Sequence, residues 1–259
     1  MERTGIRRGY FSSRRPRWKY PLYKKSVFSK RPLTVRRSLF NSRPVPEKLK
    51  LQSIHENQYG PTFTIPNNGS TTSYITYPSI GILEPNRQRS FIKLNRLRFN
   101  RTATIQSTQT DVVMDPHSPT PIARLNGVLS LVIVLDRKPH IVPGTNELDR
   151  FEEVFGVTNF SHGNLQVLAR HRDRYRIKHT FKRVISVEKE STFIKVGGLA
   201  GLSSARYPCW AGFKDLDLDN LGGNYGNQTK NAFLVFYCWM SDSPSRANMF
   251  VSFDIDYLR

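Results

Sequence analysis

Two continuous, almost entirely apolar runs constrain the fold of this chain most strongly. They are GVLSLVIVL at Gly127–Leu135 and AFLVFYCWM at Ala232–Met240. Short runs of β-branched and aromatic residues are typical of strands that are buried on both faces. Both runs are far shorter than the roughly 20 apolar residues that a membrane-spanning helix needs. We therefore expect two buried strands at the centre of a β fold, and no integral membrane insertion.

The other candidate strands alternate apolar and polar residues, which is the pattern of a strand with one buried face. In Met249–Tyr257 every odd-numbered residue is apolar, so Asp254 and Asp256 are predicted to face outward. In Tyr175–Val187 the same spacing places His179 on the inward face, where a hydrogen-bonded structural histidine is expected. The remaining strand candidates are Leu51–Ile54, Thr71–Tyr77, Phe91–Ile105 and Ile194–Val196.

One amphipathic segment predicts a helix between Thr145 and Gly156. Thr145 or Asn146 can cap it, and Gly156 can end it in a left-handed conformation. Glycine pairs at Gly197–Gly198 and Gly222–Gly223 predict turns. The apolar stripe of the helix comprises Leu148, Phe151, Val154 and Phe155. Together these segments predict an all-β fold, an antiparallel jelly-roll-like sandwich of about eight strands with one short helix.

Positive charge is concentrated at the N-terminus. The chain has a formal net charge of +20, yet residues 1–50 carry 16 Lys and Arg against two Glu, a net of +14. The other 209 residues have a net charge of only +6. Prolines at positions 16, 21, 32 and 44 discourage a continuous helix in the basic stretch. We therefore expect a disordered basic arm at residues 1–48, followed by the β-sandwich domain at 49–259.

Cationic and aromatic residues alternate in this arm, which favours contact with nucleic acid. Cations neutralise phosphates, and flat rings stack on unpaired bases. The alternative is a solvated tail that keeps a capsid-like or ribosome-like protein soluble. A second stretch, Arg87–Arg101, has six cations and no acid; it is either a phosphate track or import signal, or the exposed face of a strand. The predicted DNA-binding residues are Arg14, Arg15, Arg17, Trp18, Lys19, Tyr20, Tyr23, Arg98 and Arg101.

The clusters of Lys and Arg, together with spaced apolar residues, also indicate signals for transport into and out of the nucleus. Import receptors read extended Lys/Arg clusters through acidic grooves. An export receptor needs spaced apolar anchors, although a strand and its following turn would show the same spacing. The arm's split import signal would use Lys24, Lys25, Lys30, Arg31, Arg36 and Arg37. The export anchors would be Val184, Val187, Phe193 and Val196.

No pattern of catalytic or metal-binding residues is evident. The six histidines are scattered, and neither a nucleophile elbow nor a phosphate-binding glycine loop occurs. Cys209 and Cys238 form no zinc pattern and are expected to be buried thiols of a reducing compartment. The acidic segment Asp215–Asp219 lacks the ligand spacing of a calcium loop. We expect no enzyme activity, no metal and no cofactor.

Eight strings along almost the whole chain match one viral family. They are IHENQYGPTF, EPNRQRSFIKLNRLRF, LDRKPH, SHGNL, FKRVISVEK, CWAGFKDLD, YCWMSD and FVSFDIDY. The chain thus resembles the nuclear shuttle proteins of bipartite begomoviruses. The family's kinship to the geminivirus coat protein is consistent with a jelly roll, and leaves a capsid-type DNA-packaging protein as the alternative.

The resemblance implies a viral protein that binds single- and double-stranded viral DNA without strong sequence specificity. Such a protein shuttles DNA between host nucleus and cytoplasm and passes it to the viral movement protein at the host cell periphery. The implied partners are host import and export receptors, a host nuclear acetyltransferase and host receptor-like kinases. The family's import signals match residues 21–42 and 81–97, its export region matches about 177–198, and its acetyltransferase contact region about 150–187. In the second import signal the cations are Arg87, Arg89, Lys93 and Arg96.

Overall fold

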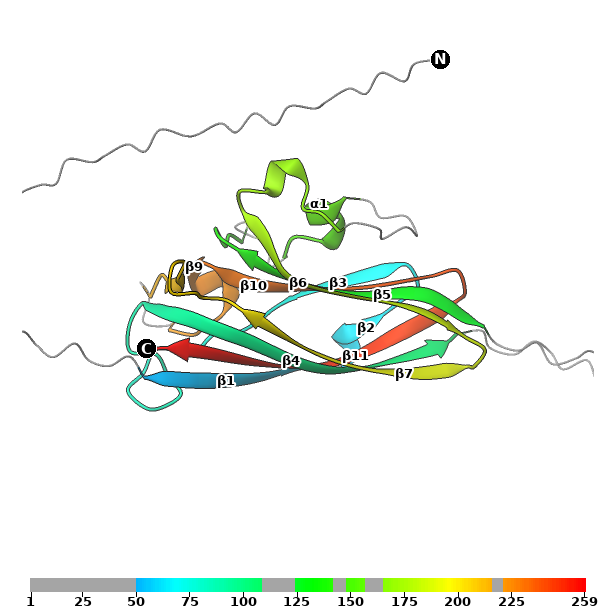
Figure 1. The fold of residues 1–259 in the computed structure, drawn as a ribbon, viewed down its shortest axis with the longest axis horizontal. Coiled ribbons are helices and arrows are strands. Elements are labelled where there is room, and N and C mark those ends of the chain that lie inside the picture. The colour runs from blue at the N-terminus through cyan, green and yellow to red at the C-terminus, as the bar shows by residue number, and fades with distance from the viewer. Residues whose placement is uncertain (1–49, 109–123, 142–147, 157–164, 216–220) are drawn as a thin grey trace, which may run out of the picture. The chain divides into compact units, whose positions relative to one another are not determined.

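The computed structural model describes residues 50–108, 124–141, 148–156, 165–215 and 221–259. These residues form two antiparallel β-sheets (Figure 1). Sheet I contains β1 (Leu51–Gln58), β2 (Thr64–Ile65), β4 (Phe91–Ser107), β7 (Ser191–Gly201), β8 (Cys209–Phe213), β9 (Gln228–Lys230) and β11 (Ser245–Leu258). Sheet II contains β3 (Gly69–Tyr74), β5 (Leu125–Asp136), β6 (Tyr175–Val187) and β10 (Ala232–Ser241). The short helices are α1 (Phe151–Phe155) and the 3-10 turns at Pro61–Phe63, Ala169–His171 and Tyr225–Asn227.

The strand order is that of a jelly roll. Four strands in the order β1-β11-β4-β7 face four in the order β3-β10-β5-β6. All pairings between these strands are antiparallel. The short strands β2, β8 and β9 extend the sheet of the first four. This confirms the prediction of an antiparallel, jelly-roll-like sandwich of about eight strands with one short helix.

The main core lies between the two sheets. The apolar residues of β11 predicted to face inward, from Met249 to Tyr257, are each at most 3% exposed. They pack with the inward residues of β4 and β10 in a single cluster. Fully burying a side chain of this size contributes about 1.5–3 kcal/mol relative to leaving it exposed. The alternation in the sequence therefore sets which face of each strand the fold buries.

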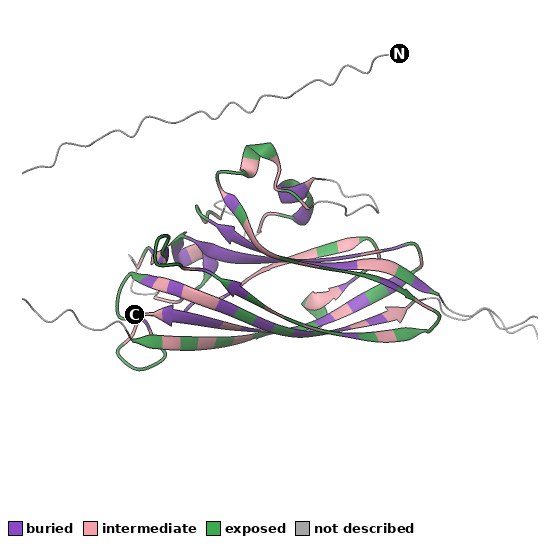
Figure 2. Ribbon diagram, in the orientation of Figure 1, coloured by how far each residue is buried: buried purple, intermediate pink, exposed green. Residues whose placement is uncertain are grey.

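Strand β10 is buried on both faces, as its unbroken apolar sequence predicts (Figure 2). One face contributes Tyr237 and Trp239 to the main core, and the other contributes Phe236 to a second cluster. In that second cluster the rings of Phe151 and Phe155 lie 6.2 and 5.3 Å from the ring of Phe236. Helix α1 thus covers the outer face of sheet II.

The predicted helix was too long at its N-terminal end. It begins at Phe151, where the Glu153 carboxylate accepts a hydrogen bond of 2.8 Å from the Arg150 N–H. Asp149 forms an ion pair of 2.8 Å with Arg174 instead of taking a place in the first turn. The predicted caps at positions 145 and 146 lie outside the described residues. Gly156 ends the helix with a φ of 85°, as predicted.

The glycine pair Gly197–Gly198 does not form a turn. Both residues lie inside β7, and Gly198 is paired with Phe99 of β4. A Cβ added to Gly198 would lie 2.2 Å from the tip of the Phe99 ring. The missing side chain therefore leaves room for an aromatic ring that is only 1% exposed.

Substituting Gly198→Ala is expected to destabilise the fold by about 1–3 kcal/mol, because the buried Phe99 ring must move to admit the new methyl group. The matched control is Gly201→Ala in the same strand, where an added Cβ meets no atom within 4 Å. Urea unfolding of both variants measures the difference. Equal stabilities would show that the Phe99 ring does not depend on the glycine.

Candidate nucleic-acid interface

The structure divides the basic stretch Arg87–Arg101 into exposed and buried cations. Arg89 is exposed, and Lys93 in β4 is half-buried. Arg96 and Arg98 also belong to β4, and their side chains are 44% and 46% exposed. Arg87 and Arg101 are buried. The six cations therefore do not form one continuous positive stripe.

Arg87 was predicted to belong to an import signal, and the structure corrects this. Its side chain is fully buried, and its guanidinium donates two hydrogen bonds of 2.6 and 2.5 Å to the Asp215 carboxylate. It also donates to the carbonyl of Pro78 and lies 3.7 Å from the centre of the Phe213 ring. The hydrogen bonds from Arg87 lower the pKa of Asp215. Arg87 therefore forms a structural ion pair with Asp215. Because its side chain is buried, a receptor cannot reach it in the folded protein.

Arg101 was predicted to contact DNA, and the structure places it in the core instead. It is 3% exposed because it shares the inward face of β4 with Phe99 and Ala103. Its guanidinium lies 3.5 Å from the centre of the Phe181 ring, and none of its nitrogens has a hydrogen-bond partner among the described residues. Burial lowers its pKa to about 9. A cation–π contact between the sheets is therefore the role of Arg101.

Arg96 and Arg98 lie on the outer face of sheet I and share one carboxylate. Both donate to Asp256, at 2.6 and 3.2 Å. Burial raises the pKa of Asp256, but the hydrogen bond from Arg96 and the charge of Arg98 outweigh it, so that the pKa is lowered. Two arginines and one carboxylate leave a single net positive charge here. Asp254 and Asp256 face outward as predicted, although Asp256 is covered by its partners.

The predicted export anchors do not form one surface. Val184 is 70% exposed and is paired with Val128 of β5 in sheet II, while Phe193 is 73% exposed and is paired with Thr104 in sheet I. Val187 packs half-buried against the main core. Val196 lies in β7 and is paired with Arg101. In the folded protein the four residues belong to two sheets.

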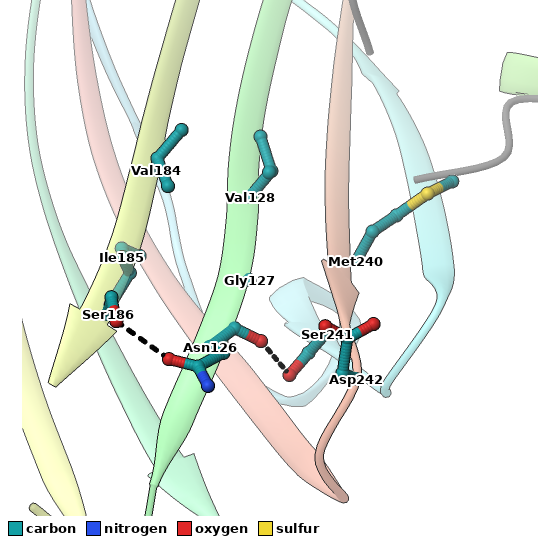
Figure 3. A pocket seen from close by; sticks show the side chains of 9 residues that line it. All are labelled: Asn126, Gly127, Val128, Val184, Ile185, Ser186, Met240, Ser241 and Asp242. Atoms are coloured by element: carbon teal, nitrogen blue, oxygen red, sulfur yellow. Dashed lines mark hydrogen bonds between the residues drawn. The ribbon is translucent and has the colours of Figure 1, made fainter. Parts of the chain in front are cut away.

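Val184 lines a depression of about 320 Å³ on sheet II. Figure 3 shows Val184 beside Val128, with Met240 on the neighbouring strand. Two hydroxyl groups around it are hydrogen-bonded, since Asn126 accepts from Ser186 and from Ser241. The depression offers a small apolar contact and no charged cluster.

The region at about 150–187 contains α1, the turn at Ala169–His171 and β6, and residues 157–164 within it lie outside the described residues. Arg174 links this region to sheet II. It forms ion pairs of 3.0 Å with Asp136 and 2.8 Å with Asp149. His179 faces the main core as predicted and is half-buried, but its ring packs against the Phe99 ring at 4.9 Å in place of the expected hydrogen bond to a described residue.

A group of cations that the sequence did not indicate comes together in a cleft. Arg137 follows β5, while Arg176 and Lys178 belong to β6. They line a cleft of about 610 Å³ together with the loop that joins β7 to β8. We call it the cationic cleft; its other lining residues are Leu135, Gly201, Leu202, Ser203, Ser204, Tyr207, Pro208, Cys209 and Asn231. Short cationic clusters at 137–138 and 174–178 were the available signal, but only the pairing of β5 with β6 brings them together.

Among the residues that the structure describes, no group of three or more His, Cys, Asp or Glu side chains is placed to hold a metal ion. Within the same residues, no helix has both the length and the apolar composition to cross a membrane. Cys209 and Cys238 are buried, unpaired thiols, and burial raises the pKa of each.

The fold and this surface define an eight-stranded jelly-roll protein with a cleft lined by three cations that have no carboxylate partner among the described residues. The chain belongs to the geminivirus coat protein/nuclear export factor BR1 family, whose model matches residues 6–259. It is 42% identical over 258 residues to the nuclear shuttle protein of Squash leaf curl virus, covering 100% of this chain and 93% of that protein. The nuclear shuttle protein of African cassava mosaic virus (isolate West Kenyan 844) is 34% identical, with 93% and 91% covered. That of Indian cassava mosaic virus is 32% identical, with 88% and 85% covered.

Substituting Asp215→Asn is expected to destabilise the fold by about 3 kcal/mol, because it leaves the buried Arg87 charge without a counter-ion. Asparagine keeps the shape and tolerates the φ of 46° at this position. In the wild type the lowered pKa of Asp215 adds stability above the unfolded value of about 4, and this is lost as pH falls through the folded value. Urea unfolding at pH 7 and at pH 3 measures both effects. The control is Asp254→Asn, which removes a partly exposed partner of His55.

Proposed function

We propose that this protein is a non-enzymatic nuclear shuttle protein. It binds single- and double-stranded viral DNA without strong sequence specificity, and carries it between host nucleus and cytoplasm. It then passes the DNA to the viral movement protein for cell-to-cell spread. The observation that carries the proposal is the concentration of charge in residues 1–50, with a net of +14 and aromatic rings between the cations. The relatives named nuclear shuttle proteins support the same role.

The arm is the main DNA contact in this proposal. Arg14, Arg15, Arg17 and Lys19 neutralise phosphates, while Trp18, Tyr20 and Tyr23 stack on exposed bases. Binding through charge and ring faces does not depend on which base is present. Arg98 adds a weaker contact on sheet I, since it shares Asp256 with Arg96.

Import is assigned first to the arm's clusters from Lys24 to Arg37. The second signal, within residues 81–97, retains Arg89, Lys93 and Arg96 after the burial of Arg87 is taken into account. Arg96 is paired with Asp256, whereas Arg89 is exposed and Lys93 is half-buried, so these two side chains are the ones we assign to receptor contact in this stretch.

For export we propose separate apolar contacts in place of one linear motif. Val184 and Phe193 are both exposed, on sheets II and I respectively. A host export receptor would bind at one of these two residues, and we favour Val184 because it lines a depression.

The region at about 150–187 is proposed to contact the host nuclear acetyltransferase. Host receptor-like kinases and the viral movement protein are the proposed partners at the cell periphery.

A capsid-type DNA-packaging protein is the second candidate, and the eight-stranded jelly roll favours it. Electron microscopy of the purified protein with single-stranded DNA separates the two functions. Regular closed shells would support the capsid function, whereas irregularly coated strands would support the shuttle.

We expect DNA affinity to fall steeply with salt. The slope of log K against log salt should be about −0.7 for each phosphate neutralised on a single strand. Replacing Arg14, Arg15, Arg17 and Lys19 with Gln should make that slope shallower by about 3. Replacing Trp18, Tyr20 and Tyr23 with Ala should weaken binding and leave the slope unchanged. Fluorescence anisotropy over a range of salt concentrations measures both, and an affinity independent of salt would contradict the electrostatic mechanism.

We expect nuclear accumulation to depend on the arm. A fusion to a tandem fluorescent protein, with Lys24, Lys25, Lys30, Arg31, Arg36 and Arg37 replaced by Ala, should lose most of its nuclear signal in plant cells. The matched variant Arg89→Ala/Lys93→Ala should retain most of it. The reverse result would assign import to the second stretch.

A further inference from the structure

The cationic cleft lies where β5 ends and β6 begins in sheet II, opposite the loop that joins β7 to β8 in sheet I. Three cations line it, and its described lining contains no Asp or Glu. A volume of about 610 Å³ is typical of sites that hold a small molecule or one nucleotide. The cleft therefore has the size and the charge of an anion site.

A β-bulge lies in β6 at the edge of the cleft. The register between β5 and β6 shifts at Ile133 and Val134, which are paired with His179 and Ile177. Lys178 is the extra residue between those two, and such a bulge redirects a side chain. Arg176 and Lys178 are two residues apart in β6, and both line the cleft.

The cations of the cleft have no carboxylate partner among the residues that the structure describes, and this distinguishes them from their neighbours. Arg174 lies two residues before Arg176 and is held by Asp136 and Asp149. Arg176, Lys178 and Arg137 form no such ion pair with any carboxylate in the described part of the chain, and no Asp or Glu lies among the residues that line the cleft. Burial lowers the pKa of Lys178, and the charges of Arg176 and Arg137 lower it further. Like charges held together in this way are relieved by a bound anion.

The loop across the cleft adds an aromatic ring. Tyr207 is 69% exposed, and the Arg206 guanidinium lies 5.4 Å from the centre of its ring. Ser204 accepts a hydrogen bond from the Tyr207 N–H, which fixes the turn that presents the ring. Ser203 is also occupied, since it donates to Leu94 and accepts from the Cys209 N–H. Cations beside an exposed ring are the combination that proteins use to bind single-stranded nucleic acid.

We propose that the cationic cleft binds a backbone phosphate of single-stranded DNA and that Tyr207 stacks on an adjacent unpaired base. The inference rests on the proposed DNA-binding function and adds to it a fixed contact on the β body. Single strands are favoured over duplex because a base inside a duplex hides the face on which Tyr207 would stack.

The test uses the full chain and a fluorescein-labelled oligothymidine of about 16 nucleotides. Arg176→Glu is compared with Lys195→Glu, which makes the same change in net charge at an exposed position of β7 outside the cleft. We expect Arg176→Glu to weaken binding about tenfold more than Lys195→Glu does. Tyr207→Ala should weaken binding to the single strand about tenfold and binding to the matching duplex much less. Both positions are exposed, and urea unfolding verifies that each variant is folded.

The outcomes separate this inference from the proposed function. If the wild-type chain binds no DNA, the proposed function fails. If it binds and Arg176→Glu behaves like Lys195→Glu, only the cleft is excluded and the arm remains as the contact. A competition experiment adds inorganic phosphate or a phosphoserine peptide at an equal concentration of phosphate groups. Displacement of the oligonucleotide by either competitor would also overturn the assignment, since the cleft would then be a general phosphate site.

Discussion

The packing of the two inner sheet faces is the interaction on which the rest of this structure depends. It fixes which residues of each strand point inward, and thereby which charges stay in water. In β4 this selection acts on cations directly, since Arg98 faces outward while Arg101, three residues later, lies inside. Arg101 is accommodated because Phe181 and Phe99 offer their ring faces, at 3.5 and 5.6 Å, in place of a counter-ion.

Ion pairs neutralise some of the cations of the β-sandwich and leave others without a carboxylate partner among the described residues. Asp215 holds Arg87, and Asp256 holds Arg96 and Arg98, so these basic residues contribute little net field despite their number in the sequence. A buried pair of this kind is costly to break because either partner alone is a desolvated charge. The local count of Lys and Arg therefore overstates the attraction of the body for a polyanion, and the arm, with a net of +14, is the stronger electrostatic element.

Local alternation was enough to predict most of the fold. The inward set of β11 and the two-sided burial of β10 follow directly from their sequences. Features that depend on partners distant in sequence were not predictable. The residues that flank Arg87 in the sequence resemble those around an exposed cation. Its burial depends on an ion pair with Asp215, which lies 128 residues later in the chain. The predicted start of the helix was too early because of another distant partner. Asp149 forms an ion pair with Arg174 and does not join the first turn.

These two selections, by burial and by ion pairing, explain why the cationic cleft, and not the basic strand, is the part of the body suited to bind an anion. In β4 the neighbouring strand β11 supplies Asp256, whose carboxylate is paired with both Arg96 and Arg98. Around the cleft, the nearby carboxylate of Asp136 is already occupied by Arg174 and Tyr225. Among the described residues, no carboxylate neutralises the cations of the cleft, so their charge is available to a ligand. A fixed cationic contact of this kind would orient a bound polyanion on the protein, since diffuse charge alone attracts without orienting.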